Sequence, residues 1–467
     1  HTDLDMVSPR SVKSSASTFH LGVSLLQKLC VKTEDNFVFS PLSLGVTLTM
    51  LAAGVKGDTK KELLDFLGTA NEADLHEMYA DLTNDRKLPI KICNKCLARD
   101  TFNVQKNYKT FVKKKYQTEV KLSDVVKNFR KADAEVNAWA ASKTNDTITQ
   151  LLNPGNISME TCMVLLSVVY FEGTWVDEFE TAYPMAFKLR DGSVIRPESL
   201  FRGSSNLRYV KTDKLKMVKI PYKEAGYYMV VAVPKDNTKH IDEVLATMTA
   251  AEMSSAVEKL NAARSPGVEL TMPKFKIDYR YSQIIDHMKE LGVHKIFIPG
   301  DGDYTGLFIN PSPETRVKHL IHQTVIVAHE KGTVATAATC VEPAEGLNLL
   351  RRRVIFKVNR AFMFCIHDGN YNIPAFIVLI SAAAVSFSAA IGPVASLCNV
   401  CVLTVDSRRC AQSCAAAVVA GTSCKQRLLQ TRQAVPKNAV RTSDHSCGVR
   451  HDTKVWTSSK RLHVLPR

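Results

Sequence analysis

Small and β-branched residues fill the stretch Glu330-Lys331-Gly332-Thr333-Val334-Ala335-Thr336-Ala337-Ala338-Thr339. Its side chains favour or tolerate extended backbone, and beyond its first two residues it carries no charge. Strand-like apolar runs lie on either side, at 320–328 and 354–366, and residues 340–350 are irregular, with a Pro and a Gly. The pattern predicts an exposed loop whose first half can also enter a β-sheet as a strand.

Four more segments carry recognisable patterns and follow one another in a fixed order. They are Asn36-Phe37-Val38-Phe39-Ser40-Pro41-Leu42-Ser43-Leu44, Val169-Tyr170-Phe171-Glu172-Gly173-Thr174-Trp175, Met272-Pro273-Lys274-Phe275-Lys276 and Phe356-Lys357-Val358-Asn359-Arg360-Ala361-Phe362. Together with the stretch at 330–339 they resemble the serpins, inhibitors whose reactive loop inserts into a sheet. Three positions depart from the family pattern: Ser167 stands for Asn, Lys331 for Glu and Ala361 for Pro.

Helical apolar spacing dominates the first 150 or so residues, and strand-like runs dominate after Cys162. This order indicates a mixed α/β (α+β) body with mostly antiparallel sheets. The resemblance implies the serpin fold over residues 1–384, with helices around a large main sheet and a reactive loop at about 330–353. We expect continuous strands at 267–275 and 354–366.

The resemblance also assigns roles to individual residues. The hinge, which would enter the sheet first, comprises Glu330, Gly332, Thr333, Val334, Ala335, Thr336, Ala337 and Ala338. The shutter and breach, which control opening of the sheet, comprise Ser40, Ser43, Ser167, Trp175 and His322. On the residues alone, His322 reads as a hydrogen-bonded interior group rather than a base or metal ligand.

The function that the resemblance implies is suicide-substrate inhibition of serine proteases. The protease supplies the nucleophile and forms a covalent acyl-enzyme with the monomeric inhibitor, so the chain needs no catalytic residue and no cofactor. The sequence contains no G-x-S-x-G, H-E-x-x-H or phosphate-binding motif, which argues against an enzyme. The alternative is a non-inhibitory serpin that carries a ligand or acts as a chaperone.

The position of the reactive bond has two readings. The family's usual spacing from Glu330 places Gly346 before the scissile bond, whereas counting back from Asn359 places Leu347 there. Leu can bury apolar area in a specificity pocket and Gly cannot. We therefore expect cleavage at Leu347-Asn348, with Gly346-Leu347 second, by chymotrypsin- or elastase-like proteases.

Cysteine spacing gives little support to a metal site. Cys93 and Cys96 lie in an alternating segment, Ile90 to Ala98, so an odd separation places their thiols on opposite faces of a strand. A zinc site needs sulfurs that converge on one point. The pair Cys398/Cys401 has no second Cys pair at the spacing that a zinc ribbon requires. We therefore expect no metal.

Two sequons, Asn145-Asp146-Thr147 and Asn156-Ile157-Ser158, suggest glycosylation and therefore secretion to the extracellular space. The chain opens at His1 without a Met, which suggests a processed or fragmentary N-terminus. Lys113-Lys114-Lys115 would suit a polyanion such as a glycosaminoglycan, but a solvated helix face is the favoured reading.

The C-terminal residues 385–467 depart from the family pattern. They hold twelve Lys/Arg against three acids, a net charge of +9 that leaves +6 of the total +15 for the body, so the charge is no argument for nucleic acid. Residues 376–405 are uncharged and long enough to span a bilayer, but the run begins inside a strand that the fold needs and is broken by Gly392-Pro393. A membrane anchor is therefore disfavoured, and we expect a disordered or non-native extension.

Truncation after Ala384 should leave the thermal unfolding temperature and inhibition unchanged or improved, because the extension offers no recognisable core. The measurement is a melting curve of the truncated and full-length chains, with a protease assay alongside. Unfolding of the truncated body, or release of a membrane-bound form into solution, would show that the extension is structural or an anchor.

Overall fold

The computed structural model describes residues 9–381, apart from 33–35, 85–88, 100, 119, 124–128, 154–155, 159, 205 and 334–352. The chain separates into two units, residues 1–389 and 390–467, and all described residues belong to the first. The expected extension at 385–467 lies outside the described residues, so that expectation stays a prediction.

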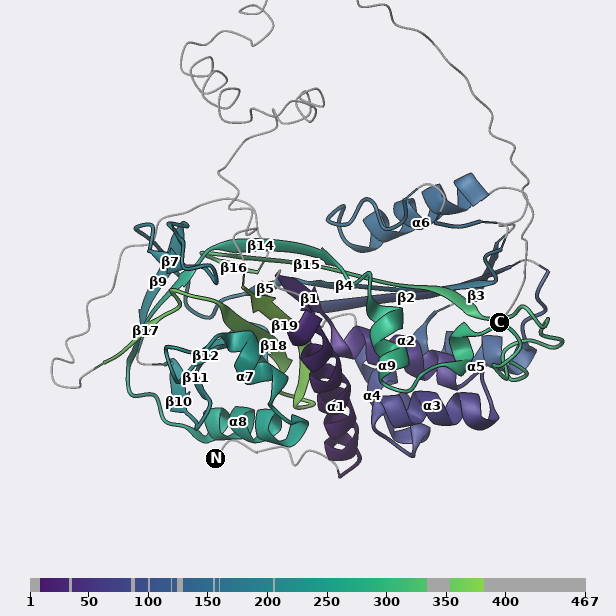
Figure 1. Ribbon diagram of the computed structural model, residues 1–467, viewed down its shortest axis with the longest axis horizontal. Coiled ribbons are helices and arrows are strands. Elements are labelled where there is room, and N and C mark those ends of the chain that lie inside the picture. Colours follow the sequence, from purple (N-terminus) through teal and green to yellow (C-terminus); the bar gives the residue numbers. More distant parts are fainter. Residues whose placement is uncertain are drawn as a thin grey trace, which may run out of the picture. The chain divides into compact units, whose positions relative to one another are not determined.

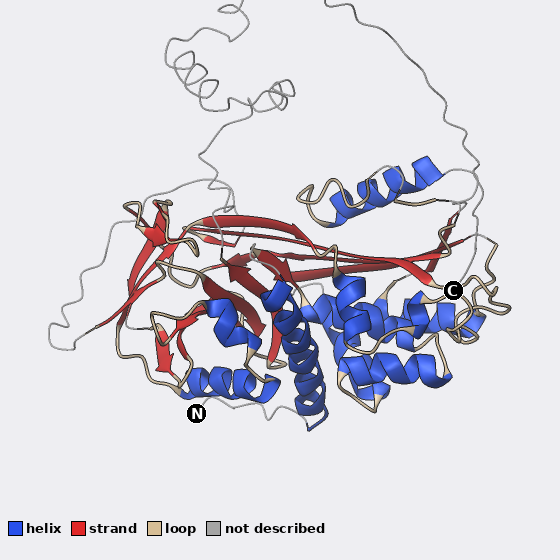
Figure 2. Ribbon diagram, viewed as in Figure 1, coloured by secondary structure: helices blue, strands red, loops and turns tan. Residues whose placement is uncertain are grey.

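Helices predominate before residue 144 and strands after residue 162, as expected for a mixed α/β (α+β) body (Figures 1 and 2). The helices are α1 Pro9–Lys32, α2 Pro41–Ala52, α3 Gly57–Leu67, α4 Glu72–Asn84, α5 Lys106–Tyr116, α6 Phe129–Lys143, α7 Ile241–Ala246, α8 Ala250–Ala262, α9 Ile284–Glu290 and the 3-10 helix Lys295–Phe297. The strands are β1 Phe37–Phe39, β2 Ile90–Arg99, β3 Val120–Ser123, β4 Met163–Phe171, β5 Gly173–Thr174, β6 Glu180–Ala182, β7 Phe187–Lys188, β8 Val194–Ile195, β9 Ser199–Ser204, β10 Arg208–Lys211, β11 Leu215–Pro221, β12 Tyr227–Pro234, β13 Val268–Pro273, β14 Phe275–Arg280, β15 Val317–His329, β16 Gly332–Thr333, β17 Val354–Lys357, β18 Phe362–Asp368 and β19 Ile373–Ile380.

The main sheet has seven strands in the order β3-β2-β4-β15-β16-β5, with β14 paired to β15. A six-stranded sheet runs β1-β19-β18-β12-β11-β10 and a four-stranded sheet runs β17-β13-β9-β6. Most strand pairs are antiparallel, but the long central pair β4 and β15 is parallel. The expected α+β fold with a large main sheet is therefore confirmed.

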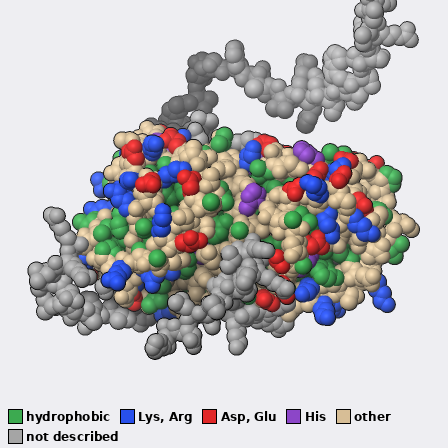
Figure 3. All heavy atoms as spheres, turned by 90° about the horizontal axis from the view of Figure 1, so that it is seen from below, with side chains coloured by type: hydrophobic (Ala, Val, Ile, Leu, Met, Phe, Trp, Pro, Cys, Tyr) green, Lys and Arg blue, Asp and Glu red, His purple; other side chains and the backbone are tan. Residues whose placement is uncertain are grey.

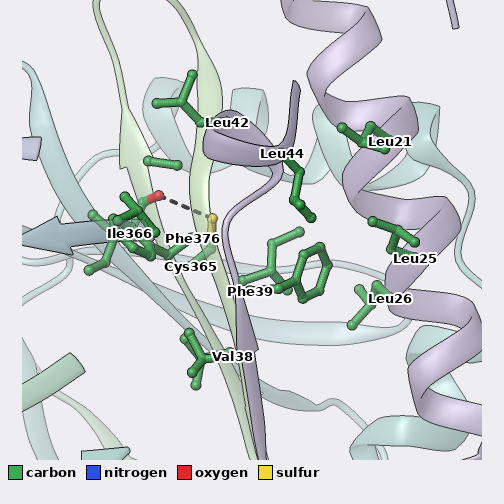
Figure 4. Packing of buried hydrophobic residues seen from close by; sticks show 14 of the residues in the cluster. Leu21, Leu25, Leu26, Val38, Phe39, Leu42, Leu44, Cys365, Ile366 and Phe376 are labelled. Atoms are coloured by element: carbon green, nitrogen blue, oxygen red, sulfur yellow. Dashed lines mark hydrogen bonds between the residues drawn. The ribbon is translucent and has the colours of Figure 1, made fainter. Parts of the chain in front are cut away.

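Two apolar clusters cover opposite faces of the main sheet. The larger joins α1, α2 and the six-stranded sheet, and Figure 4 shows Leu21, Phe39 and Phe376 within it. The smaller lies between α6 and the other face, where α6 is seen in Figure 1. Cys96 belongs to the first cluster and Cys93 packs against the second, so the prediction that these thiols face opposite sides is confirmed.

Two expected strands are each broken into two. The segment expected at 267–275 ends as β13 at Pro273, and β14 begins at Phe275 in the main sheet. The segment expected at 354–366 divides into β17 and β18, which also belong to different sheets. Proline cannot donate to a ladder, and a chain that passes between sheets must interrupt its pairing, so continuous strands were the wrong expectation.

The segment at 376–380 forms part of β19, as expected, and pairs with both β1 and β18. Val378 is fully buried opposite Val38 and Phe364. Within the described part of the chain, no helix has the length and apolar character needed to cross a bilayer.

Candidate functional site

Five buried polar residues form what we call the shutter cluster: Ser40, Ser43, Asn94, Ser167 and His322. Asn94, Ser167 and His322 lie directly opposite one another across β2, β4 and β15. Ser43, at the start of α2, places its Oγ 2.9 Å from Ser167 Oγ and 3.3 Å from Asn94 Oδ1. The cluster therefore ties α2 to the middle of the main sheet.

The N-terminus of α2 explains why two serines reach this position. Ser40 has extended backbone and caps the helix, its Oγ accepting from the Ser43 N–H at 3.0 Å, and Pro41 occupies the first turn, where no N–H is needed. The Ser40 hydroxyl also donates to the carbonyl of Ala375 on β19, at 2.6 Å. One cap thus connects α2, the six-stranded sheet and the main sheet.

His322 is the centre of the cluster and is fully buried. The Ser40 N–H donates to its Nε2 at 2.9 Å, so the proton of the neutral ring belongs on Nδ1, which lies 3.0 Å from Ser167 Oγ. Burial lowers the pKa of His322 to about 3, so the ring is neutral at physiological pH. The hydrogen bond from His322 to Ser167 crosses between β15 and β4.

Asn94 is the functional residue that sequence reasoning missed. Its Nδ2 donates to the Ser43 carbonyl at 3.3 Å, so an amide is present beside Ser167 although Ser replaces the family's Asn there. The alternating pattern of β2 places residue 94 inside the sheet, but only the register with Ser167 shows that it joins the cluster. The sequence around residue 94 does not reveal that register, because Asn94 and Ser167 lie far apart along the chain.

At one end of the same sheet, Trp175 forms the breach. Its indole is fully buried and stacks on Tyr222, with ring centroids 4.4 Å apart, and its Nε1 donates to the His329 carbonyl at 2.9 Å. Its backbone N–H donates to the Lys331 carbonyl, also at 2.9 Å. Trp175 therefore holds the chain where β15 turns toward the loop.

Two of the residues predicted to form the hinge lie in the main sheet. Gly332 and Thr333 form β16, antiparallel to both β15 and β5. A Cβ added at Gly332 would overlap the carbonyl oxygen of Gly173 and come within 2.9 Å of Thr174 Cα, so only glycine fits this approach. A chain that extended β16 in the same direction would run between β15 and β4.

An ion pair holds Glu330, the first residue of the predicted hinge, against the sheet. Its carboxylate lies 3.0 Å from Lys274 Nζ, between β13 and β14, and accepts from Thr181 Oγ1 at 3.1 Å. Burial alone would raise the pKa of Glu330, but the backbone hydrogen bond and Lys274 lower it below its usual value. Lys331, where the family has Glu, donates its backbone N–H to His329 Nδ1 at 3.1 Å.

The remainder of the loop, 334–352, lies outside the described residues. Those positions include the hinge residues Val334, Ala335, Thr336, Ala337 and Ala338, and both readings of the reactive bond, Gly346, Leu347 and Asn348. Their assignments stay predictions. The return is described from Arg353, whose guanidinium lies 3.7 Å from Glu269 and beside Gly203, before β17 begins.

The other predicted sites lie away from the shutter cluster and the start of the loop. Asn145 is exposed in a turn, whereas Asn156 is half-buried and accepts from the Asn153 N–H at 2.8 Å. Lys113, Lys114 and Lys115 end α5, with the first two exposed. The described residues contain no group of His, Cys, Asp and Glu suited to a metal ion. Figure 3 shows positive and negative side chains interspersed over one face.

Acidification should destabilise the protein through its buried histidines. Burial lowers the pKa of both His322 and His367 to about 3, so between about pH 6.5 and 3 the unfolded state binds more protons than the folded state. The free energy of unfolding should therefore fall with pH below about 6.5, approaching about 1.4 kcal/mol per pH unit for each histidine.

The measurement is denaturant unfolding from pH 7.5 to 4.5 for the wild type, His322→Gln and His294→Gln, the last an exposed control. His322→Gln should be less stable at pH 7.5 but show a shallower pH dependence, and His294→Gln should match the wild type. An unchanged slope in His322→Gln would contradict a buried neutral ring.

Comparison with known proteins agrees with this geometry. The family model described as "Serpin (serine protease inhibitor)" matches residues 16–381. A "Serine protease inhibitor" of Cyanea capillata is 27% identical over 75% of this chain and 94% of its own length. The "Leukocyte elastase inhibitor" of Equus caballus is 26% identical over 77% of this chain and 97% of its own length.

Solved structures show the same fold. The native thermophilic serpin tengpin has a TM-score of 0.70 at 22% identity, covering 82% of this chain and 96% of its own. Maspin has a TM-score of 0.72 at 17% identity, covering 80% of this chain and 100% of its own. At these identities the likeness shows the fold alone, but the family model covers most of the chain. The chain therefore belongs to the serpin family.

Proposed function

We propose that this serpin is a suicide-substrate inhibitor of serine proteases. The observation that carries the proposal is β16: the hinge residues Gly332 and Thr333 are paired antiparallel between β15 and β5. Beyond them β4 and β15 run parallel and adjacent. A chain that continued past Thr333 would be antiparallel to both neighbours, the geometry that gives each a full ladder of hydrogen bonds.

The inhibitory cycle needs only the loop and the sheet of this chain. The protease serine attacks a loop carbonyl, the peptide bond breaks, and the upstream segment stays esterified to the protease. That segment then inserts from Thr333 between β4 and β15. Insertion separates the β4–β15 pairs, including Ser167 opposite His322, and so breaks the hydrogen bond between them. The protease, moved with the segment, retains the ester unhydrolysed.

The proposed reactive bond is Leu347-Asn348. The nearest described residues on either side of this bond are Thr333 in β16 and Arg353. Arg353 contacts Glu269, which favours a residue earlier in the loop as the one that the protease recognises. Leucine suits the apolar pocket of chymotrypsin- or elastase-like proteases. N-terminal sequencing of the released fragment reads the bond directly: Asn348 should be first, and a fragment beginning at Leu347 would favour the second reading.

The proposed partner and setting follow from the mechanism. The complex is covalent and contains one protease and one inhibitor monomer. We further propose secretion with glycosylation at Asn145, because this asparagine is exposed in a turn, whereas Asn156 is half-buried.

One cavity in the described part of the chain bears on the competing function, a non-inhibitory ligand carrier. An apolar cavity between α1, α8 and the six-stranded sheet is lined by Phe19, Val23, Val257 and Cys365 among others, and its volume is about 20 Å³. That is room for about one water molecule, far less than a drug-sized ligand needs. A chaperone role would leave the loop uninserted, so a test for the adduct separates both alternatives from inhibition.

The test is to mix the protein with chymotrypsin-, elastase- and trypsin-like proteases and look for an SDS-resistant adduct. The wild type should form one with a chymotrypsin- or elastase-like enzyme. Thr333→Arg should be cleaved at a similar rate but form little adduct, because a guanidinium entering a sheet meets a large desolvation penalty. Thr333→Ser, the matched control, should behave as wild type.

Cleavage of the wild type without any adduct would contradict the proposed function. Undiminished adduct from Thr333→Arg would contradict the hinge assignment, while leaving inhibition itself standing.

A further inference from the structure

Arg202, in β9 of the four-stranded sheet, is an arginine with almost no exposure: 4% of its side chain is accessible. Burying a guanidinium is unfavourable unless charge and hydrogen bonds compensate it. Its partners all lie in the segment 175–179 that follows β5, which we call the clamp segment. No part of the inhibitory cycle described above uses this arginine.

Arg202 binds the clamp segment at two residues. Its Nη1 donates to the backbone carbonyl of Asp177 at 2.8 Å, and its Nη2 pairs with the carboxylate of the same residue. The guanidinium carbon lies 5.8 Å from the centroid of the Phe179 ring, within the range of a cation–π contact. A planar, forked cation satisfies these three contacts at once, which an ammonium group cannot do.

On its other side the clamp segment holds the base of the hinge. Three successive carbonyls, those of residues 329–331, each accept one hydrogen bond from it. The His329 carbonyl accepts from Trp175 Nε1 at 2.9 Å, that of Glu330 from the Phe179 N–H at 2.8 Å, and that of Lys331 from the Trp175 N–H at 2.9 Å. The clamp segment thus lies between Arg202 and the first residues that would enter the sheet.

We propose that Arg202 is a positioning residue for the hinge. By fixing Asp177 and Phe179, it holds the three donors of the clamp segment in register with residues 329–331, and so keeps β16 formed before cleavage. This role rests on the proposed function for its consequence, since a preformed β16 gives insertion its starting point. The positioning itself is a property of the uncleaved protein.

The local charges allow this role to be separated from global stability. Asp177 is about half exposed, with 48% of its side chain accessible, so water can solvate its carboxylate when Arg202 is replaced. A Met at 202 has similar length and fills the same apolar space. Removing one partner of an ion pair is most costly where the remaining charge stays buried, which the half-exposed Asp177 does not. The expected effect is therefore local loosening of the clamp segment.

The first measurement is amide hydrogen exchange of the uncleaved wild type, Arg202→Met and Arg196→Met. Arg196 is an exposed arginine six residues earlier and serves as the matched control. Exchange of the Trp175 and Phe179 amides should rise by about tenfold or more in Arg202→Met, while amides in β11 and β12 keep their wild-type protection. Unchanged exchange at 175 and 179, or a uniform rise across the protein, would overturn the proposal.

The second measurement is the ratio of SDS-resistant adduct to cleaved, released inhibitor. In Arg202→Met this ratio should fall by about tenfold if insertion slows by that factor, while the rate of loop cleavage stays the same. Arg202→Lys, which keeps the charge but not the fork, should fall between Arg202→Met and the wild type. An Arg202→Met ratio equal to wild type would overturn the link to insertion.

The two measurements test different claims, so either can contradict its claim without the other. If the wild type forms no adduct with any protease, the proposed function is wrong, but the exchange result still decides whether Arg202 positions the hinge.

Discussion

The parallel pairing of β4 with β15 is the constraint on which the rest of the structure depends. A parallel pair cannot be closed by a short hairpin, and here residues 172–316 separate the two strands in sequence. The main sheet is therefore joined at its centre by hydrogen bonds between distant segments. A strand that entered antiparallel to both could also hydrogen-bond with β4 and β15, and under the proposed function the loop of the same chain is that strand.

Under the proposed function, two polar arrangements set the balance between the closed sheet and the sheet with its loop inserted. The hydrogen bond between His322 and Ser167 joins β15 to β4 in a fully buried setting, where an unpaired donor costs about 1–3 kcal/mol. At the end of the sheet, Trp175 and Lys274 hold the start of the loop against the sheet. If the loop inserts as proposed, the first arrangement opposes separation of β4 from β15, and the second holds the start of the loop where insertion would begin.

The sequence was sufficient for features that depend on local alternation, since the pattern of β2 separates Cys93 from Cys96. The glycine, threonine and alanine run after Glu330 predicts a hinge because small, extended residues are what a sheet can accept. Gly332 and Thr333 lie in β16, but the residues after them lie outside the described part of the chain, so the hinge stays a prediction. Asn94 and Arg202 could not be identified in this way. Asn94 joins the cluster through the register of β2 with β4, and Arg202 contacts a segment 25 residues away in sequence, and both relations arise only in the folded chain.

The most direct test of the account is the thermal stability of the protein after cleavage in its loop. A protease that cuts within 334–352 without being trapped, followed by a melting curve, measures whether the freed segment becomes a strand. Insertion should raise the unfolding temperature by at least about 10 °C, because a central strand adds several kcal/mol. An unchanged or lower unfolding temperature after complete cleavage would contradict the claim that this sheet accepts its own loop.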